Sequence, residues 1–301
     1  MSKDGSEASF RDRAFAFLQS LLPTRALSGL MFHVAQFRLK PFKNGLIRWF
    51  MLKYAVDLEE AEWTQVDNYE HFNAFFTRAL KPGMRTQPAQ PNQFSSPVDG
   101  AISQFGPIRQ GMLFQAKGHH YSAAQLLADE ELAKTFWNGS FATIYLAPHN
   151  YHRVHMPCTG KLRSWAYVPG RLFSVNPSTA RAVPGLFARN ERMVALFDTP
   201  FGPMALVMVG AIIVGGIETV WNGRLTPPHR RNVAPTYYEP MQPLVLQRGA
   251  ELGRFHMGST VIVLAPAGAL SWKHELTPAR EVRLGEALAT MAGPTPTKLQ
   301  A

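Results

Sequence analysis

Apolar residues recur at helical spacing through the first 56 residues, in three successive stripes. The stripes consist of Phe10, Ala14, Phe17, Leu18, Leu21 and Leu22, then of Leu27, Leu30, Met31, Val34 and Phe37, then of Leu46, Ile47, Phe50, Met51 and Tyr54. Pro23 and Pro41 follow the first two stripes, and proline ends a helix because it has no amide hydrogen to donate. The pattern therefore predicts three amphipathic helices in succession.

Strand signals dominate the rest of the chain. A further helix is predicted at 69–80 and a loop rich in Pro and Gln at 81–97. From 98 to about 266, short β-branched and aromatic runs alternate with Gly, Pro and Asn, and one helix at 123–137 interrupts them. The predicted strands are clearest at 141–146, 206–214 and 260–264. We therefore expect an α+β protein, with N-terminal amphipathic helices followed by a β-rich domain.

The longest uncharged, apolar-rich run covers residues 204–217. It is short for a membrane-spanning helix, which needs roughly 20 residues. It also contains Gly210, Gly215 and Gly216, which favour two buried strands and a bend over a helix. We therefore expect no transmembrane helix.

The helical region is strongly basic. No acidic residue occurs between 24 and 56, and the whole chain has 31 basic against 21 acidic residues, a formal charge of +10. The candidates for contact with an anionic surface are Arg38, Lys40, Lys43, Arg48, Trp49 and Lys53. Basic amphipathic helices can lie in a membrane interface with their cations on the headgroups. They can equally be core-facing helices with solvated basic faces, and the residues alone leave both interpretations open.

The composition is that of a globular protein, because 46% of the 301 residues are hydrophobic and only 17% are charged. The excess of cations indicates an anionic partner, which by composition alone is a nucleic acid, an acidic membrane surface or an acidic ligand. The single cysteine, Cys158, cannot form an intramolecular disulfide, which fits a reducing compartment. The first residues, MSKDGSEASFRDR, lack the basic-then-apolar order of a secretory signal.

The first candidate for chemistry is the sequence Gly258-Ser259-Thr260, directly before an apolar run. A serine hydroxyl can attack the carbonyl of the preceding residue. A glycine there allows this approach, because it has no Cβ and tolerates unusual backbone angles. The same three residues also form a common turn at the start of a strand.

The second candidate is the segment 151–157, YHRVHMP, in which His152 and His155 could act as bases near neutral pH. On a regular strand the two side chains would point to opposite faces, so a shared site requires the backbone to turn. The alternatives are a buried structural histidine and a metal ligand. The clustered metal-ligating side chains are His119, His120, His152, His155 and Cys158, which match no zinc spacing, so we expect no metal site.

The third candidate is Asp99 in SPVDG, residues 96–100. An aspartate can orient a histidine and stabilise its protonated form, as in a Ser-His-Asp triad, although an Asp-Gly pair is also a common turn. The sequence has no Gly-x-Ser-x-Gly motif, phosphate loop or dinucleotide fingerprint, which argues against an α/β-hydrolase and against nucleotide-binding enzymes.

Taken together and in this order, these motifs resemble the membrane-associated phosphatidylserine decarboxylases of proteobacteria. The blocks that carry the resemblance are FNAFFTR (72–78), SPVDG (96–100), QAKGH (115–119), YHRVHMP (151–157), PGRLFSVN (169–176), LFARNER (186–192), IETVW (217–221) and GRFHMGST (253–260). They span nearly the whole chain. The family's cleavage motif is usually Leu-Gly-Ser-Thr, and here Met257 stands in place of the leucine. This change is apolar and conservative, so we expect processing to survive it.

The resemblance implies a self-processing enzyme. Asp99, His155 and Ser259 would form the processing triad, in which His155 deprotonates Ser259 and Asp99 orients His155. The Ser259 oxygen would attack the carbonyl of Gly258. Elimination and hydrolysis would then leave a β chain, 1–258, and an α chain, 259–301, that begins with a covalent pyruvoyl group. The implied parts are a membrane-associating helical segment (1–66), a β-rich pyruvoyl-dependent decarboxylase domain (67–292) and a flexible tail (293–301).

The resemblance also implies a reaction and a location. Phosphatidylserine would form a Schiff base with the pyruvoyl group, lose CO2 and leave as phosphatidylethanolamine, because the carbonyl acts as an electron sink. His152 would serve this second reaction as a proton donor. The implied setting is the cytoplasmic face of the cell membrane, bound peripherally to an anionic surface, as a homodimer and without a nucleic-acid partner.

Three other functions remain possible on the residues. A serine hydrolase could use Ser259, His155 and Asp99 without cutting itself. A membrane-binding scaffold could keep the same motifs without activity. A pyruvoyl enzyme could act on a soluble amino acid, although the apolar, basic N-terminal region would then lack an explanation.

Overall fold

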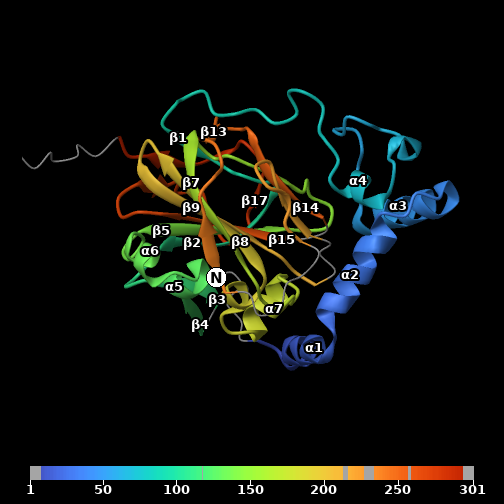
Figure 1. Ribbon diagram of the computed structural model, residues 1–301, viewed down its shortest axis with the longest axis horizontal. Helices are drawn as coiled ribbons and strands as arrows, with labels where there is room; N and C mark the ends of the chain where they lie inside the picture. Colours follow the sequence, from blue (N-terminus) through green and yellow to red (C-terminus); the bar gives the residue numbers. More distant parts are fainter. Residues whose placement is uncertain (1–7, 117, 213–215, 227–233, 257–258, 294–301) are drawn as a thin grey trace, which may run out of the picture.

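The computed structural model describes residues 8–116, 118–212, 216–226, 234–256 and 259–293; the side chain of Ser259 also lies outside the description. Three N-terminal helices run along one side of a β-rich body (Figure 1). They are α1 (Phe10–Leu21), α2 (Thr24–Ala35) and α3 (Lys40–Tyr54). The expected α+β architecture is thus confirmed.

The body is built on a nine-stranded antiparallel sheet, whose order is β12-β7-β8-β9-β15-β5-β2-β17, with β13 also pairing β7. Its strands are β2 (Gly100–Pro107), β5 (Ser140–Leu146), β7 (Gly160–Val168), β8 (Arg192–Thr199), β9 (Gly202–Val209), β12 (Thr236–Tyr238), β13 (Val245–Leu246), β15 (Ser259–Ala265) and β17 (Glu281–Val282). Along β8, β9 and β15 successive residues enter two different core clusters. The sheet is therefore covered on both faces, which explains why these strands are continuously apolar.

Smaller sheets and short helices cover the two faces (Figure 1). The smaller sheets contain β1 (Gln93–Ser95), β16 (Leu270–Trp272) and β18 (Ala287–Met291); β6 (Arg153–His155), β10 (Gly216–Thr219), β11 (Gly223–Arg224) and β14 (Glu251–His256); and β3 (Met112–Ala116) with β4 (His119–Ser122). The short helices are η2 (Val66–Asn68), α4 (Phe72–Phe76), α5 (Ala123–Leu127), α6 (Glu130–Lys134), α7 (Pro177–Ala182) and α8 (Leu186–Arg189).

Several predicted elements were wrong in detail. The helix expected at 69–80 is the five-residue α4, and the helix expected at 123–137 is split at Ala128, whose φ of 58° ends α5. Pro41 does not end the second helix; α2 stops at Ala35, and Pro41 lies in the first turn of α3, where proline needs no amide hydrogen. The strand expected at 206–214 ends at Val209. The pattern also missed α7, α8 and the strands after residue 266.

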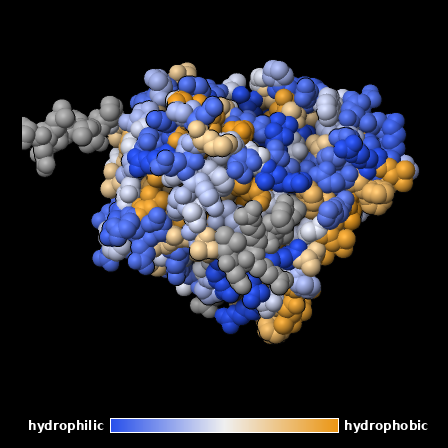
Figure 2. All heavy atoms as spheres, in the orientation of Figure 1, coloured by the Kyte–Doolittle hydropathy of each residue, from blue (hydrophilic) through white to orange (hydrophobic). Residues whose placement is uncertain are grey.

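The first helix turns its apolar stripe outward. Its buried residues are Asp12, Ala16 and Gln19. Gln19 accepts a hydrogen bond from the Ser174 amide at 2.7 Å, and Asp12 pairs with Arg181. The large apolar side chains left exposed on the three helices and their connections are Phe10, Phe15, Phe17, Leu18, Leu21, Leu22, Leu30, Phe37, Leu39, Phe42, Trp49 and Leu52. Figure 2 shows apolar areas on the side of the molecule where α1–α3 lie.

A third core cluster joins α2 and α3 to the segment around α4. It includes Ile47 and Phe50 of α3 and Phe72, Phe75 and Phe76 of α4. The expected division between residues 66 and 67 therefore passes through one packed cluster. Among the described residues, no helix is long and apolar enough to cross a bilayer.

Candidate active site

Ser259 begins the central strand β15. Its backbone pairs with Leu146 of β5, and β15 is held on its other side by β9. Gly258, the other residue of the predicted cleavage site, lies outside the described residues. The backbone thus places the predicted scissile bond at the point where the chain enters the middle of the main sheet.

Asp99 lies at the same end of the sheet as Ser259. It directly precedes β2, in which Ala101 pairs with Tyr145, and Tyr145 in turn pairs with Thr260. A Cβ at Gly100 would lie 2.4 Å from the Tyr145 carbonyl oxygen, so a glycine is required for this approach of β2 to β5. The register therefore puts Asp99 and Ser259 near one level, two strands apart.

The Asp99 carboxylate is held by neighbours other than His155. Arg85 donates to it through Nε at 2.9 Å and Nη2 at 2.6 Å, and the Leu284 amide donates at 2.7 Å. The expected direct orientation of His155 by Asp99 does not occur among the described contacts. The sequence could not reveal this, because Arg85 and Leu284 are remote from Asp99 along the chain and carry no motif.

His155 is oriented by a backbone carbonyl instead. Its Nδ1 donates to the Gly249 oxygen at 2.8 Å, and its Nε2 accepts from the Tyr151 hydroxyl at 3.2 Å. Burial lowers the pKa of His155, and the Gly249 carbonyl opposes this shift in part. The imidazole is therefore neutral at pH 7, with its basic lone pair on Nε2, as a general base requires.

His152 is completely buried. Its Nδ1 donates to the Asn150 carbonyl at 2.8 Å, its ring lies 4.1 Å from that of Phe76 between centroids, and within the described residues its Nε2 has no partner. Burial, reinforced by the positive charge of Arg78, lowers the pKa of His152 to about 3. The resting side chain is therefore neutral, and Nε2 can donate a proton only after taking one up.

The two histidines occupy different positions relative to the cleavage segment. The His152 carbonyl accepts from the Phe255 amide at 3.0 Å, whereas His155 pairs with Glu251 in the β6–β14 ladder. His152 is thus beside the end of β14 that leads to residues 257–258. His155 lies further along β14, opposite Glu251.

The motifs gave no role to a hydrogen-bonded set next to the cleavage segment, formed by the buried Asn73 and His256 and the half-buried Glu218. The Asn73 amide donates to Nδ1 of His256 at 2.6 Å, and Nε2 of His256 donates to Glu218 at 2.9 Å. The hydrogen bond from His256 is the main reason why the pKa of Glu218 is lowered. All three residues fall in blocks that carry the family resemblance, which was the available signal.

A cavity of about 470 Å³ opens beside Asp99. Tyr151 also lines it, and its charged lining residues are the three arginines Arg78, Arg85 and Arg283 and the five acidic residues Asp57, Glu59, Glu60, Asp99 and Glu281. Arg78 is buried and donates to the His149 carbonyl at 3.2 Å. In the described part of the chain, no three His, Cys, Asp or Glu side chains are placed to hold a metal ion.

The predicted membrane-binding residues divide into two groups. Arg38, Lys40, Arg48, Trp49 and Lys53 are exposed. The prediction for Lys43 was wrong: its side chain is buried, and its ammonium donates to Asn44 Oδ1 at 2.7 Å and lies 3.4 Å from the Val66 carbonyl. Lys43 shares a helix face with Ile47 and Phe50, which pack inward, and burial lowers its pKa.

Comparison with known proteins identifies the family. The family model described as phosphatidylserine decarboxylase matches residues 72–290, and a second one, PSD, matches residues 14–55. The chain belongs to the phosphatidylserine decarboxylase family. Similar relatives, each named phosphatidylserine decarboxylase proenzyme, come from Pseudomonas paraeruginosa, Pseudomonas fluorescens and Stutzerimonas stutzeri. They are 55%, 54% and 52% identical, over 93%, 92% and 94% of this chain and 98%, 97% and 96% of theirs.

Membership of the family covers both parts of the fold. The longer match contains Asp99, His152, His155 and Ser259, and the shorter one falls on the three N-terminal helices. The helices are therefore part of the family's pattern and accompany the β-rich body.

Proposed function

We propose that this chain cuts itself between Gly258 and Ser259 and then, as a carboxy-lyase, converts phosphatidylserine to phosphatidylethanolamine and CO2. The observation that carries the proposal is the family match over residues 72–290, which includes every residue of the predicted site. The neutral His155, with its lone pair on Nε2, supports the first reaction.

In the proposed self-cleavage, His155 Nε2 takes the proton of the Ser259 hydroxyl. The freed oxygen attacks the Gly258 carbonyl carbon, the peptide C–N bond breaks, and an ester replaces the amide. Loss of the Ser259 Cα proton then expels the Gly258 carboxylate and leaves dehydroalanine. Tautomerisation and attack by water release ammonia and complete the new terminus.

Asp99 contributes to this step through its charge. Its carboxylate favours the protonated form of His155 without a direct hydrogen bond. The Tyr151 hydroxyl must leave Nε2 before the serine can use it. Burial raises the pKa of Tyr151 to about 12, so the phenol keeps its own proton at pH 7 and does not protonate or deprotonate His155.

The residues around the new terminus of β15 fit a pyruvoyl group. His152 offers a buried Nε2 without a partner among the described atoms, beside the segment that leads to Ser259. The pyruvoyl carbonyl supplies the electron sink that a decarboxylation needs. Phe76 packs on His152 and keeps water from its ring. We assign to His152 the transfer of a proton to the substrate carbon after CO2 leaves.

We propose that the helices α1–α3 bind the enzyme peripherally to the anionic, cytoplasmic face of the membrane. The outward apolar stripe of α1 supports this, because a core-facing helix would bury that stripe. The exposed cations of the predicted set lie on the same region of the chain. By likeness to the family, the cleaved enzyme is a homodimer of paired α and β chains.

The test is the intact mass of the purified protein and of its Ser259→Ala variant. The wild type should give residues 1–258 and a fragment 259–301 that is lighter, by one ammonia, than a chain beginning with serine. Ser259→Ala should remain one chain and release no CO2 from phosphatidylserine. An uncut wild type that hydrolyses esters would instead indicate a serine hydrolase, and a small fragment from Ser259→Ala would overturn the cleavage assignment.

A further inference from the structure

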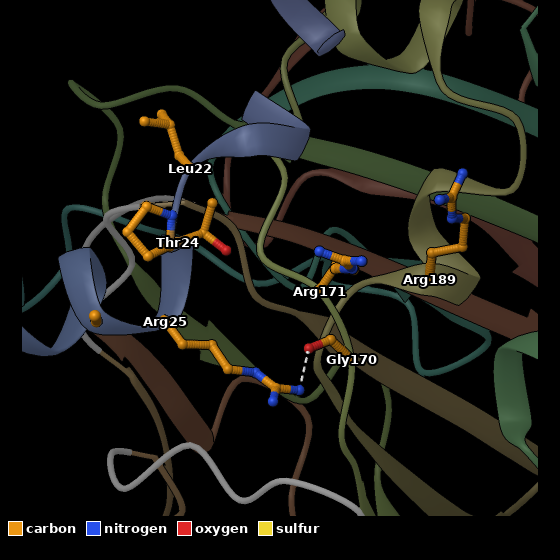
Figure 3. A pocket seen from close by; sticks show the side chains of 8 residues that line it. Leu22, Thr24, Arg25, Gly170, Arg171 and Arg189 are labelled. Atoms are coloured by element: carbon orange, nitrogen blue, oxygen red, sulfur yellow. Dashed lines mark hydrogen bonds between the residues drawn. The ribbon is translucent and has the colours of Figure 1, made fainter. Parts of the chain in front are cut away.

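A second cavity, of about 570 Å³, lies where α1 meets α2. One wall is formed by residues 22–26, and the other by Gly170, Arg171 and Arg189. Figure 3 shows Arg25, Arg171 and Arg189 around the same opening. The cavity shares no lining residue with the site that contains Asp99, His152 and His155.

The cavity is positively charged without local compensation. None of its lining residues is acidic, and among the described residues none of the three arginines forms an ion pair. Arg25 donates to the Gly170 carbonyl at 2.7 Å, and the Arg189 guanidinium lies 5.5 Å from the centre of the Phe173 ring. These contacts leave most of the guanidinium donors free for an anion. The N-terminus of α2, which has no side-chain cap, adds a partial positive charge at the same place.

The segments that carry Arg171 and Arg189 are fixed to each other. The Arg171 amide donates to the Arg189 carbonyl at 2.8 Å. The buried Asn190 amide donates to the carbonyls of Phe173 and Gly210, each at 2.9 Å. A Cβ at Gly170 would lie 2.5 Å from the backbone between Asn190 and Glu191, so only glycine allows the two segments to approach this closely. The two guanidinium groups therefore project from a rigid base, and little order has to be created on binding.

The cavity lies at the border of the apolar surface. Leu22 lines it and is 46% exposed, and Leu18 and Leu21 on the preceding turn are 60% and 65% exposed. If these leucines enter the acyl region, the arginines are held at the depth of lipid phosphates. A free phosphate would gain nothing from the leucines, whereas a phospholipid would use both features.

We propose that this three-arginine pocket binds the headgroup phosphate of an anionic phospholipid that anchors the enzyme and is not turned over. Planar guanidinium groups match the paired oxygens of a phosphate better than ammonium groups do. The inference rests on the peripheral membrane binding proposed above, but not on cleavage or decarboxylation.

The experiment measures binding of the full-length protein to vesicles of phosphatidylcholine, with and without phosphatidylglycerol, which has no amine and cannot be decarboxylated. Arg171→Gln/Arg189→Gln should weaken binding to the phosphatidylglycerol vesicles by about 30-fold. The matched control is Arg109→Gln/Lys161→Gln, which removes two exposed cations of the β-rich body. It should bind like the wild type. Circular dichroism melts of all variants report folding.

A variant that keeps both charges distinguishes a pocket with specific guanidinium contacts from general attraction by positive charge. Arg171→Lys/Arg189→Lys keeps both charges but loses the planar forks, and should bind about fivefold more weakly than the wild type. Equal binding of the lysine variant and the wild type would overturn the pocket. So would equal losses in the two glutamine variants. Inorganic phosphate, added at constant ionic strength, should compete only weakly; full displacement by phosphate, with no preference for phosphatidylglycerol vesicles, would show a free-anion site instead.

Discussion

At the scale of single residues, the site depends on neutral histidines held by backbone carbonyls. Gly249 fixes His155 and Asn150 fixes His152, in each case through Nδ1, so both rings present Nε2 to their surroundings. Among the described atoms, Nε2 of His155 has a hydroxyl partner and Nε2 of His152 has none. The difference in surroundings supports two successive roles for two residues that are three positions apart in the chain.

His152→Ala should cleave normally but decarboxylate slowly. The imidazole is outside the proposed processing triad, whereas a positioned acid or base typically contributes roughly 10²–10⁴-fold to the rate. A gel for cleavage and a CO2-release assay on the same sample measure the two effects. The control is His274→Ala, at an exposed histidine. A His152→Ala protein that stays uncut would move this residue into processing, and one with full activity would make it structural.

His256 should position the cleavage segment. Its ring links α4 to β10 and precedes Gly258 by two residues, so His256→Ala should slow cleavage by roughly 10- to 100-fold, the value of a hydrogen bond to a charged group. Glu218→Gln keeps an acceptor for Nε2 and should cleave faster than His256→Ala. Cleavage is followed over time on a gel. A wild-type rate in His256→Ala, or an equal rate in the two variants, would contradict this role.

At the scale of elements, the sequence predicted a helix well where residues close in the chain determine its ends. The first stripe predicted α1 closely, because Ser9 caps the helix and Pro23 follows it. The sequence did not predict the break at Ala128, because a left-handed backbone position is usually marked by glycine and here it is occupied by alanine. Which face of α1 is buried also depends on tertiary contacts, since Gln19 and Asp12 are tied to distant residues.

The same limit applies to the site. The motifs located Asp99, His152, His155 and Ser259 because each stands in a recognisable block. Arg85 was missed because it reaches Asp99 from a loop without a motif. Lys43 was assigned to the membrane because it belongs to the basic run without acidic residues. Its ammonium instead lies near the carbonyls of Val66 and Asp67, which only the fold brings close.

Replacing Arg38, Lys40, Arg48 and Lys53 by Gln should weaken binding to anionic vesicles, because each cation near such a surface contributes about 1 kcal/mol. Sedimentation with vesicles at low salt measures the effect. The matched control replaces four exposed cations of the β-rich body, Arg109, Lys134, Lys161 and Arg163. An equal loss of vesicle binding in the two quadruple variants would show that binding depends on the net charge of the protein and not on the position of these cations. Lys43→Gln should lower the melting temperature instead, since Lys43 is buried.

At the scale of the whole molecule, the proposed cleavage divides the main sheet without opening it. The fragment 259–301 contains β15, which lies between β5 and β9, and β17, which pairs with β2. Its β16 and β18 form a sheet with β1. The smaller chain therefore supplies strands to two sheets of the larger one, and neither sheet is complete without it.

The two chains should consequently stay together until the whole protein unfolds. Val261, Ile262 and Leu264 of β15 are fully buried, and each such side chain contributes about 1.5–3 kcal/mol through burial. The cleaved enzyme should elute as one species in gel filtration. The fragment should separate only at the denaturant concentrations at which the tryptophan fluorescence shows that the larger chain unfolds. Uncut Ser259→Ala is the control for the transition itself. Release of the fragment before that transition would mean that β15 is held less firmly than its central position in the sheet requires.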